Sequence, residues 1–298
     1  MKILNFGSLN IDYVYNVDHI IVSGETLSAS DRNIFPGGKG LNQSVAFARA
    51  GANVWHAGNI GKEDGGILLD TLKENSINTD YLQQLDNAPS GHTVIQVDKT
   101  GLNCILVYGG ANSLQTRENI DNTLKNFSAN DYLILQNEIN DISYIMEKAK
   151  SIGMKIILNP SPIDEDILAL PLDYVDVFMV NEIEAAQLVD GDSDEELLDN
   201  FVKKYPDAHT VMTIGSRGAH YAYKDQREFH GIFDIKVVDS TAAGDTFTGY
   251  FIQTFAETND AYEALRVASA ASTLAVSRAG ASTSIPYLEE VEQFLAEV

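Results

Sequence analysis

The sequence predicts a three-layer α/β sandwich with a mostly parallel central sheet and a second, smaller β-sheet that forms a lid. From Tyr132 onward, short apolar strands alternate with helices, an order typical of parallel sheets covered on both faces. Two β-rich stretches, about 13–34 and 91–108, interrupt this alternation and predict the lid. No internal repeat or linker divides the chain, so we expect a single domain over residues 1–298.

Each element of the first half rests on a local pattern. A short apolar run that ends at Gly7 predicts the first strand, and small residues after a glycine-rich turn predict the first helix. Two apolar runs around a short polar turn predict a hairpin. The expected elements are strands over 2–6, 53–59, 92–98 and 103–108, helices over 41–50 and 67–75, and β-rich pieces over 13–15 and 19–22 before a sharp break at 35–40.

In the second half the strands end at proline-rich, glycine-rich or polar turns. The acidic residues 190–199 are expected on a solvent-exposed helix face. The other expected elements are strands over 132–136, 155–159, 176–180 and 210–214, helices over 139–152, 182–189 and 261–276, a helix ending near 257, and a hairpin of 221–223 with 228–230.

Composition restricts the partners that the chain can have. Its net charge of −23, from 43 acidic and 20 basic residues, argues against nucleic acids and anionic membranes. A nucleotide stays possible, because a few amides and a magnesium ion can outweigh a distant acidic surface. The single cysteine, Cys104, fits a reducing cytoplasm. The N-terminus is too quickly polar for a signal peptide, and no apolar run is long enough for a membrane helix.

The stretch 238–247 combines an anion site with a base. Ala242, Ala243 and Gly244 have almost no side chain, so their N–H groups can approach a ligand closely at a helix start, where partial positive charge attracts anions. Asp245 follows in the first turn, where a carboxylate can accept the proton of a hydroxyl that attacks a phosphate. Such an arrangement suits phosphoryl transfer to an alcohol. The same residues also fit an ordinary helix start capped by Asp.

Polar groups also follow the first strand and precede the first helix. Asn10 and Asp12 face the same way in an extended segment and could hold sugar hydroxyls. Gly38 and Lys39 precede a helix that carries Asn42 in its first turn, without the spacing of a Walker A loop. These groups could hold a polar substrate. Each segment also fits an ordinary polar turn.

Two later segments suit a magnesium ion and a nucleotide. Asn181 and Glu184 share a helix face, and their oxygens could hold magnesium directly or through water. They also fit a helix cap close to a capping box. Thr213, Gly215 and Gly218 end a strand at the same sheet edge, where a nucleotide could lie. The six histidines lack metal-ligand spacing, and neither GxSxG nor a GxGxxG after the first strand is present.

Together these motifs resemble those of the ribokinase-like (PfkB) carbohydrate kinases, over nearly the whole chain. The resemblance implies ATP-dependent phosphorylation of a primary sugar hydroxyl, with ribose as the first expectation and fructose, another ketose or a nucleoside as alternatives. A non-catalytic sugar or nucleotide sensor is the alternative of another class, against which the intact Gly244 and Asp245 argue. The matching segments are 7–12, 36–43, 109–112, 159–162, 181–185 and 239–247.

The resemblance also implies a role for each matching residue. Asp245 is implied as the catalytic base, with Ala242, Ala243 and Gly244 as the anion hole. The implied sugar contacts are Asn10, Asp12, Gly38, Lys39, Asn42 and Glu138, and the nucleotide contacts are Asn181, Thr213, Gly215, Gly218 and Gly244. The implied cation ligands are Asn181 and Glu184 for magnesium, and Asp239, Thr241, Ala275, Gly280 and Ser284 for an activating potassium ion.

The lid is implied to close over the sugar and to form a homodimer. Its expected sugar-facing positions are Thr93, Ile95 and Val107. Thr93 stands where ribokinases often carry a smaller apolar residue, and Asn137 adds a polar group beside Glu138. One added hydroxyl can redirect the choice of sugar, because an unpaired buried polar group costs about 1–3 kcal/mol.

Overall fold

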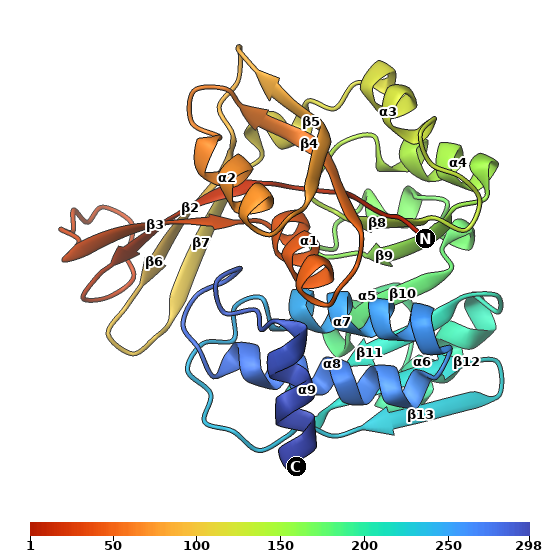
Figure 1. Ribbon diagram of the computed structural model, residues 1–298. Helices are drawn as coiled ribbons and strands as arrows, with labels where there is room; N and C mark the ends of the chain where they lie inside the picture. Colours follow the sequence, from red (N-terminus) through yellow and green to blue (C-terminus); the bar gives the residue numbers. More distant parts are fainter.

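The computed structural model describes residues 1–298 and contains two β-sheets, a nine-stranded one and a four-stranded one (Figure 1). The large sheet consists of β1 (Ile3–Phe6), β4 (Val54–Gly61), β5 (Asn78–Leu85), β8 (Tyr132–Gln136), β9 (Lys155–Asn159), β10 (Val177–Asn181), β11 (His209–Thr213), β12 (Ala219–Tyr223) and β13 (Gln226–His230). Their order is β13-β12-β11-β10-β9-β8-β1-β4-β5; the pairs β11–β12 and β12–β13 are antiparallel, and all other pairs are parallel. This confirms the predicted mostly parallel sheet.

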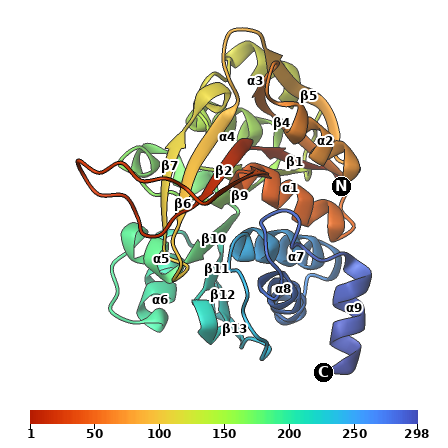
Figure 2. The ribbon, with the colours of Figure 1, turned by 90° about the vertical axis from the view of Figure 1, so that its left-hand side faces the viewer.

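Helices cover both faces of the large sheet, because neighbouring side chains of each strand enter different cores. In β9, Ile157 belongs to one apolar cluster and Ile156 and Leu158 to the other. Figure 2 shows the two helical layers on opposite sides of the strands. One layer contains α1 (Lys39–Arg49), α2 (Gly66–Glu74), α7 (Ala243–Thr258), α8 (Ala261–Val276) and α9 (Leu288–Glu297), and the other contains α3 (Arg117–Leu124), α4 (Ile142–Ile152), α5 (Glu182–Leu188) and α6 (Asp194–Lys204).

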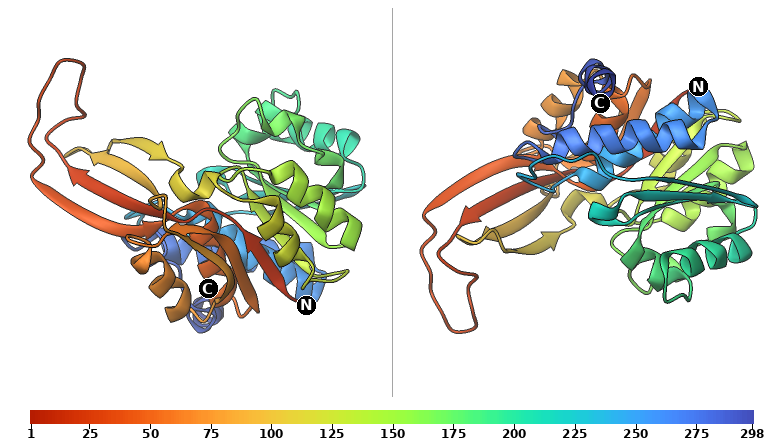
Figure 3. Two further views of the ribbon diagram at one scale, coloured as in Figure 1. Left: turned by 90° about the horizontal axis from the view of Figure 1, so that it is seen from above. Right: turned by 90° about the horizontal axis from the view of Figure 1, so that it is seen from below.

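The four-stranded sheet projects from the body as the predicted lid (Figures 1 and 3). Its strands are β2 (Asn10–Asn16), β3 (Asp31–Gly37), β6 (Gly91–Val97) and β7 (Asn103–Tyr108), in the order β3-β2-β6-β7. Its first two strands extend beyond the predicted range 13–34, since β2 begins at Asn10 and β3 continues through Pro36 to Gly37. Proline is tolerated there because β3 is an edge strand.

Several predicted elements differ from the structure. Residues 19–22 form a loop, because β2 already pairs with β3 on one side and β6 on the other. Helix α4 begins at Ile142, after Asp141 in a left-handed conformation, and not at 139. The edge strand β5 and helices α3 and α9 were not predicted. No helix has the length and apolar character needed to cross a membrane.

Candidate active site

The start of α7 presents unused backbone donors. Ala242 adopts a left-handed conformation with φ 60° and precedes the first helical residue. The N–H groups of Ala242, Gly244 and Asp245 donate to no protein acceptor, whereas that of Ala243 donates to the Ser240 carbonyl at 3.3 Å. A Cβ at Gly244 would meet only open space, so this glycine leaves room for a ligand. Three unused amides at a helix start therefore face an open volume, as an anion site requires.

Asp245 is held by two side chains of α1. It is 8% exposed; its Oδ2 accepts a hydrogen bond from Asn42 Nδ2 at 3.1 Å, and its Oδ1 accepts one from Gln43 Nε2 at 3.0 Å. The N-terminal parts of α1 and α7 thus meet at this carboxylate. We gave Asn42 a role from the sequence but missed Gln43, although a glutamine among the small buried residues of a helix was a visible signal.

Two adjoining cavities meet at the start of α7. A polar cavity of about 270 Å³ is lined by Lys39, Glu184 and Asp245 among others. A mainly apolar cavity of about 300 Å³ is lined by Phe233, Phe247 and others, together with all three predicted residues of the β11 edge. Thr213, Ser240, Ala243 and Gly244 line both cavities. The polar cavity can take phosphate groups, and the apolar one a base.

The predicted magnesium residues Asn181 and Glu184 form a reciprocal cap at the start of α5. Asn181 Oδ1 accepts from the Glu184 N–H at 2.8 Å, and Glu184 Oε2 accepts from the Asn181 N–H at 3.0 Å. Both line the polar cavity. Asn159 lines it too, and its buried Oδ1 has no hydrogen-bond partner. This unpaired oxygen and the Glu184 carboxylate form a donor set that suits a hydrated magnesium ion.

A second group of polar side chains lies at the root of the lid. Asn10 Oδ1 accepts from Asn112 Nδ2 at 2.8 Å, and Asp12 Oδ1 accepts from Thr93 Oγ1 at 2.6 Å. Burial raises the pKa of Asp12 to about 6, although the Thr93 hydrogen bond opposes this shift. Gly37 of β3 is paired with Asn10, and a Cβ there would overlap the Asp12 carboxylate, so a larger residue would displace this side chain.

Glu138 lies between the root of the lid and the start of α1. Its Oε2 accepts hydrogen bonds from the Ser8 hydroxyl and from the Lys39 N–H, the latter at 3.1 Å. Burial raises the pKa of Glu138. Burial alone would lower the pKa of Lys39, but the charges of Asp245, Glu138 and Glu184 outweigh it and raise this pKa. Lys39 is therefore a stable cation in an acidic site.

The other lid positions are more open. Thr93 is buried, whereas Val107, its partner on β7, is exposed, and Ile95 lies one pleat further along β6. Asn137 donates its side-chain amide to the Pro162 carbonyl at 2.7 Å. Thr93 is thus the lid residue that contacts another predicted sugar-binding side chain.

Four of the predicted potassium residues lie in two loops, and Ala275 lies in the last turn of α8. Asp239 Oδ1 accepts from the Thr241 N–H and hydroxyl, and its Oδ2 accepts from the Gly280 N–H at 3.0 Å. Burial would raise the pKa of Asp239, but these hydrogen bonds outweigh it and lower this pKa. The Ala275 carbonyl accepts from the Arg278 N–H, and the Ser284 hydroxyl donates to the Ala281 carbonyl. The donor set consists of oxygens only, which fits potassium.

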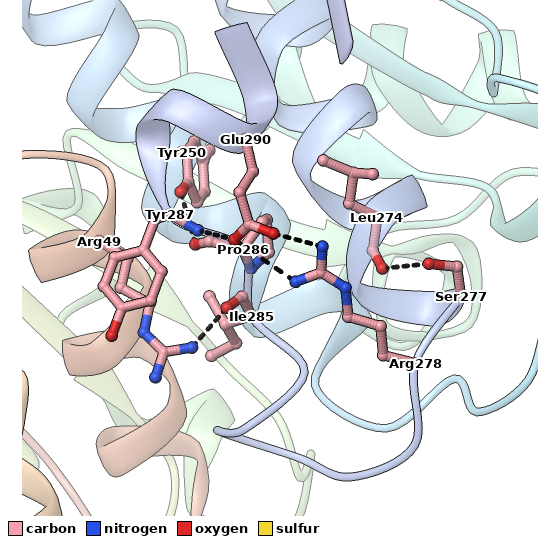
Figure 4. A network of polar contacts seen from close by, with 9 residues as sticks. All are labelled: Arg49, Tyr250, Leu274, Ser277, Arg278, Ile285, Pro286, Tyr287 and Glu290. Carbon is pink, nitrogen blue, oxygen red and sulfur yellow. Dashed lines mark hydrogen bonds and ion pairs between the residues drawn. The ribbon is translucent and has the colours of Figure 1, made fainter. Parts of the chain in front are cut away.

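Side chains from three helices hold the segment between α8 and α9 (Figure 4). The Arg49 guanidinium of α1 donates to the carbonyls of Ser282 and Ile285. The Tyr250 hydroxyl of α7 donates to the Pro286 carbonyl at 2.8 Å, and Arg278 pairs with Glu290 of α9. The loop with Gly280 and Ser284 is therefore anchored to the helices that carry Asn42 and Asp245.

A family model described as pfkB family carbohydrate kinase matches residues 1–288. A ribokinase of Staphylococcus aureus (strain COL) is 33% identical, and the match covers 98% of this chain and 99% of that protein. The ribokinase structure of Thermotoga maritima has a TM-score of 0.87 at 34% identity and covers 99% of each chain. The Arabidopsis thaliana ribokinase complexed with ribose and ATP has a TM-score of 0.86 at 28% identity and covers 98% of each chain.

Proposed function

The chain belongs to the PfkB family of carbohydrate kinases, and from this membership we propose that it transfers the γ-phosphate of ATP to a primary hydroxyl of ribose. One observation carries the proposal: the Asp245 carboxylate and the unused amides at the start of α7 line a polar cavity beside an apolar one. The similarity to ribokinases, one of them complexed with ribose and ATP, supports ribose as the sugar.

The sugar would bind between the root of the lid and the start of α1. Asp12 and Glu138 carry oxygens that accept hydrogen bonds from hydroxyls, while Asn10, Lys39 and Asn42 can donate to them. Thr93 would act through Asp12, to which its hydroxyl donates. Gly38 would let the backbone approach the sugar, since it has φ +94° and no side chain. A small molecule with several hydroxyls matches this mixture of donors and acceptors.

ATP would bind across the two cavities. Its base would enter the apolar cavity beside Gly215 and Gly218, and its phosphates would lie in the polar cavity beside Asn181 and Lys39. Thr213 lines both cavities and would lie at their junction. The γ-phosphate would then lie at the amides of Ala242 to Asp245.

The reaction would be an in-line transfer at the start of α7. The lid excludes water, and the Asp245 carboxylate accepts the proton of the attacking hydroxyl. The amides of Ala242, Gly244 and Asp245 then stabilise the charge that grows on the transferred phosphoryl group. Lys39, held as a cation, adds positive charge to the same cavity.

Two cations would support this reaction. Asn181, Glu184 and Asn159 would hold magnesium, which neutralises phosphate charge when bound. Asp239 and Thr241, with carbonyls of Ala275, Gly280 and Ser284, would hold potassium beside the anion hole. We expect turnover to rise several-fold when potassium replaces tetramethylammonium at constant ionic strength. Asp239→Asn is expected to remove this response. Equal turnover of the unchanged protein in potassium and in tetramethylammonium would contradict the site.

The lid would also form a homodimer. The outer strand β7 exposes Ile105, Leu106, Val107 and Tyr108 and has an unpaired edge. Exposed apolar residues on an edge strand favour pairing with another strand. A second copy of the lid is the partner that the similarity to this family supports.

The test is ADP release by the purified protein with a panel of pentoses, hexoses and nucleosides, in the presence of magnesium and potassium. A clear preference for ribose is the expected result. A preference for fructose, another sugar or a nucleoside would keep the kinase mechanism and overturn ribose. Calorimetric binding of a sugar without any turnover would instead favour a sensor.

A further inference from the structure

Five buried polar side chains lie behind Asp245, between α1 and the large sheet. They are each 0–1% exposed and come from β1, α1, β4 and β8: Asn5, Gln43, Ser44, His56 and Gln136. Figure 1 shows α1 against this part of the sheet. The mechanism above uses none of the five. A buried polar group is unfavourable unless it is paired or has another role.

These side chains form one continuous chain of hydrogen bonds that ends at Asp245. Gln43 Nε2 donates to Asp245 Oδ1 at 3.0 Å, and Gln43 Oε1 accepts from Gln136 Nε2 at 2.6 Å. Gln136 Nε2 also donates to Asn5 Oδ1 at 3.0 Å. Asn5 Nδ2 donates to Ser44 Oγ at 2.9 Å, and Ser44 Oγ lies 2.8 Å from His56 Nδ1.

The far end of the chain fixes its direction. Burial lowers the pKa of His56 to about 4, so the ring is neutral at physiological pH. Ser44 Oγ already accepts from Asn5, so its hydroxyl proton is available to His56 Nδ1. Asn5 Nδ2 also donates to the Gly40 carbonyl at 2.7 Å, which leaves Asn5 Oδ1 to accept from Gln136. Every amide in the chain is thereby oriented.

Gln43 has only one orientation that satisfies both of its neighbours. With its amide reversed, its oxygen would face the Asp245 carboxylate and its NH₂ would face the NH₂ of Gln136. Both contacts would be repulsive. The chain therefore ensures that an N–H group, and not an oxygen, faces Asp245 Oδ1.

The network is not fully satisfied. Gln136 Oε1 is buried and has no hydrogen-bond partner. Well-packed apolar side chains would avoid this unfavourable burial. A role in orienting Asp245 explains why polar side chains occupy these positions.

We propose that Gln43 is a positioning residue for the base, and that Gln136 acts through it. The inference rests on the proposed function, in which Asp245 accepts the proton of the hydroxyl. Gln43 at Oδ1 and Asn42 at Oδ2 together fix the plane of the carboxylate. Lys39 lines the same cavity and would compete for a carboxylate that was free to rotate.

The test compares Gln43→Met, Gln136→Met and the double variant in steady-state assays with ATP and the preferred sugar of the panel. For Gln43→Met we expect kcat to fall about 10- to 100-fold, a part of the 10²- to 10⁴-fold that general-base catalysis contributes. Both KM values should change less than about threefold.

Gln136→Met should lower kcat less, and the double variant should match Gln43→Met, because Gln136 acts only through Gln43. The matched control is Gln253→Met, a buried glutamine of α7 whose Nε2 donates to Glu257, and its kcat should be unchanged. If Gln43→Met does not fold, Gln43→Glu keeps the shape, removes the donor and should lower kcat further.

A kcat of Gln43→Met within twofold of the unchanged protein would overturn the inference. So would additive losses in the double variant, or a KM for the sugar that rises as much as kcat falls. The Asp245→Asn variant separates the two proposals. If Asp245→Asn turns over normally, the role of Asp245 as base fails and this inference fails with it; if it is inactive while Gln43→Met is normal, only this inference fails. The proposed function itself fails only if the unchanged protein turns over no substrate of the panel.

Discussion

Asp245 and Asp12 are two acidic side chains of one site, but the two sheets of the molecule hold them differently. Asp245 lies beside the nine-stranded sheet, and both of its oxygens accept hydrogen bonds from amides of α1. Asp12 lies in the four-stranded lid, where one oxygen accepts from the Thr93 hydroxyl. Asp245 is therefore held by the packed core, and Asp12 by a single sheet.

The surroundings of the two sheets explain the difference. Helices cover both faces of the large sheet, whereas the lid projects from the body and all six residues of β7 are exposed (Figures 1 and 3). A sheet with few buried contacts can move as a unit when a ligand binds. From this difference we expect chemistry and recognition to be separated: changes beside the large sheet should alter kcat, and changes in the lid should alter KM.

The largest effect is expected for Asp245→Asn. The amide cannot accept the proton of the attacking hydroxyl, so kcat should fall about 10²-fold or more. The affinity for sugar, measured by calorimetry, should stay within about threefold, because the lid is unchanged. Near-normal turnover would show that Asp245 is not the base, and the expected link between the large sheet and kcat would lose its main support.

The second effect concerns the lid and depends on pH. Asp12 has a pKa raised to about 6, and only its ionised form accepts hydrogen bonds from the sugar at both oxygens. The value of kcat/KM for sugar should therefore fall about tenfold per pH unit below pH 6. Thr93→Val removes the hydrogen bond that lowers the pKa of Asp12. This pKa should therefore rise, and the acid limb of the pH profile of kcat/KM should move to higher pH.

Thr93→Ser, which keeps the hydroxyl, is the matched control and should leave the limb in place. Glu138 also has a raised pKa and titrates nearby, so only the shift between Thr93→Val and Thr93→Ser reports Asp12. A limb that is identical in both variants would show that another group controls sugar binding.

The comparison also separates what the sequence reveals from what it hides. The lid and the start of α7 were predictable because glycines, β-branched runs and an acidic residue lie close together in the sequence. The strand β5 was missed because polar residues predominate in it without strict alternation, as an edge strand that pairs on one side only allows. The contact between Gln43 and Gln136 joins residues 93 positions apart, so no local sequence pattern predicts it.

A third and smaller effect is expected at the outer edge of the lid. Leu106→Lys places a charge on β7, where Leu106 is 70% exposed, and should convert the proposed dimer to a monomer in light scattering. We expect the KM for sugar to rise several-fold while kcat changes less than about twofold. Leu102→Lys makes the same change in the hairpin turn, outside the strand, and should remain dimeric. A dimeric Leu106→Lys would exclude this edge as the interface.

The smallest effect is one of stability, and it should have opposite signs at the two carboxylates. The pKa of Asp12 is raised from 3.8 to about 6 in the folded protein, so its ionisation destabilises the fold as pH rises through this window. The full shift corresponds to about 3 kcal/mol. The amide oxygen of Asp12→Asn can still accept from the Thr93 hydroxyl, but this bond to a neutral acceptor is weaker and offsets part of the gain. Asp12→Asn should thus stabilise the protein by about 1 kcal/mol at pH 7.5 and not at pH 4, because most of the destabilising ionisation takes place above pH 4, between the unfolded pKa of 3.8 and the folded pKa of about 6.

Asp245→Asn should instead lower the stability at pH 7.5, because the two buried amide donors then face a neutral amide in place of a carboxylate, and Gln136 keeps Gln43 from turning to accept from the new NH₂. Urea unfolding of both variants at the two pH values measures the difference. If both variants gained stability at pH 7.5, the carboxylate of Asp245 would be no better held than that of Asp12. The contrast between a fixed base and a thinly supported recognition group would then be wrong.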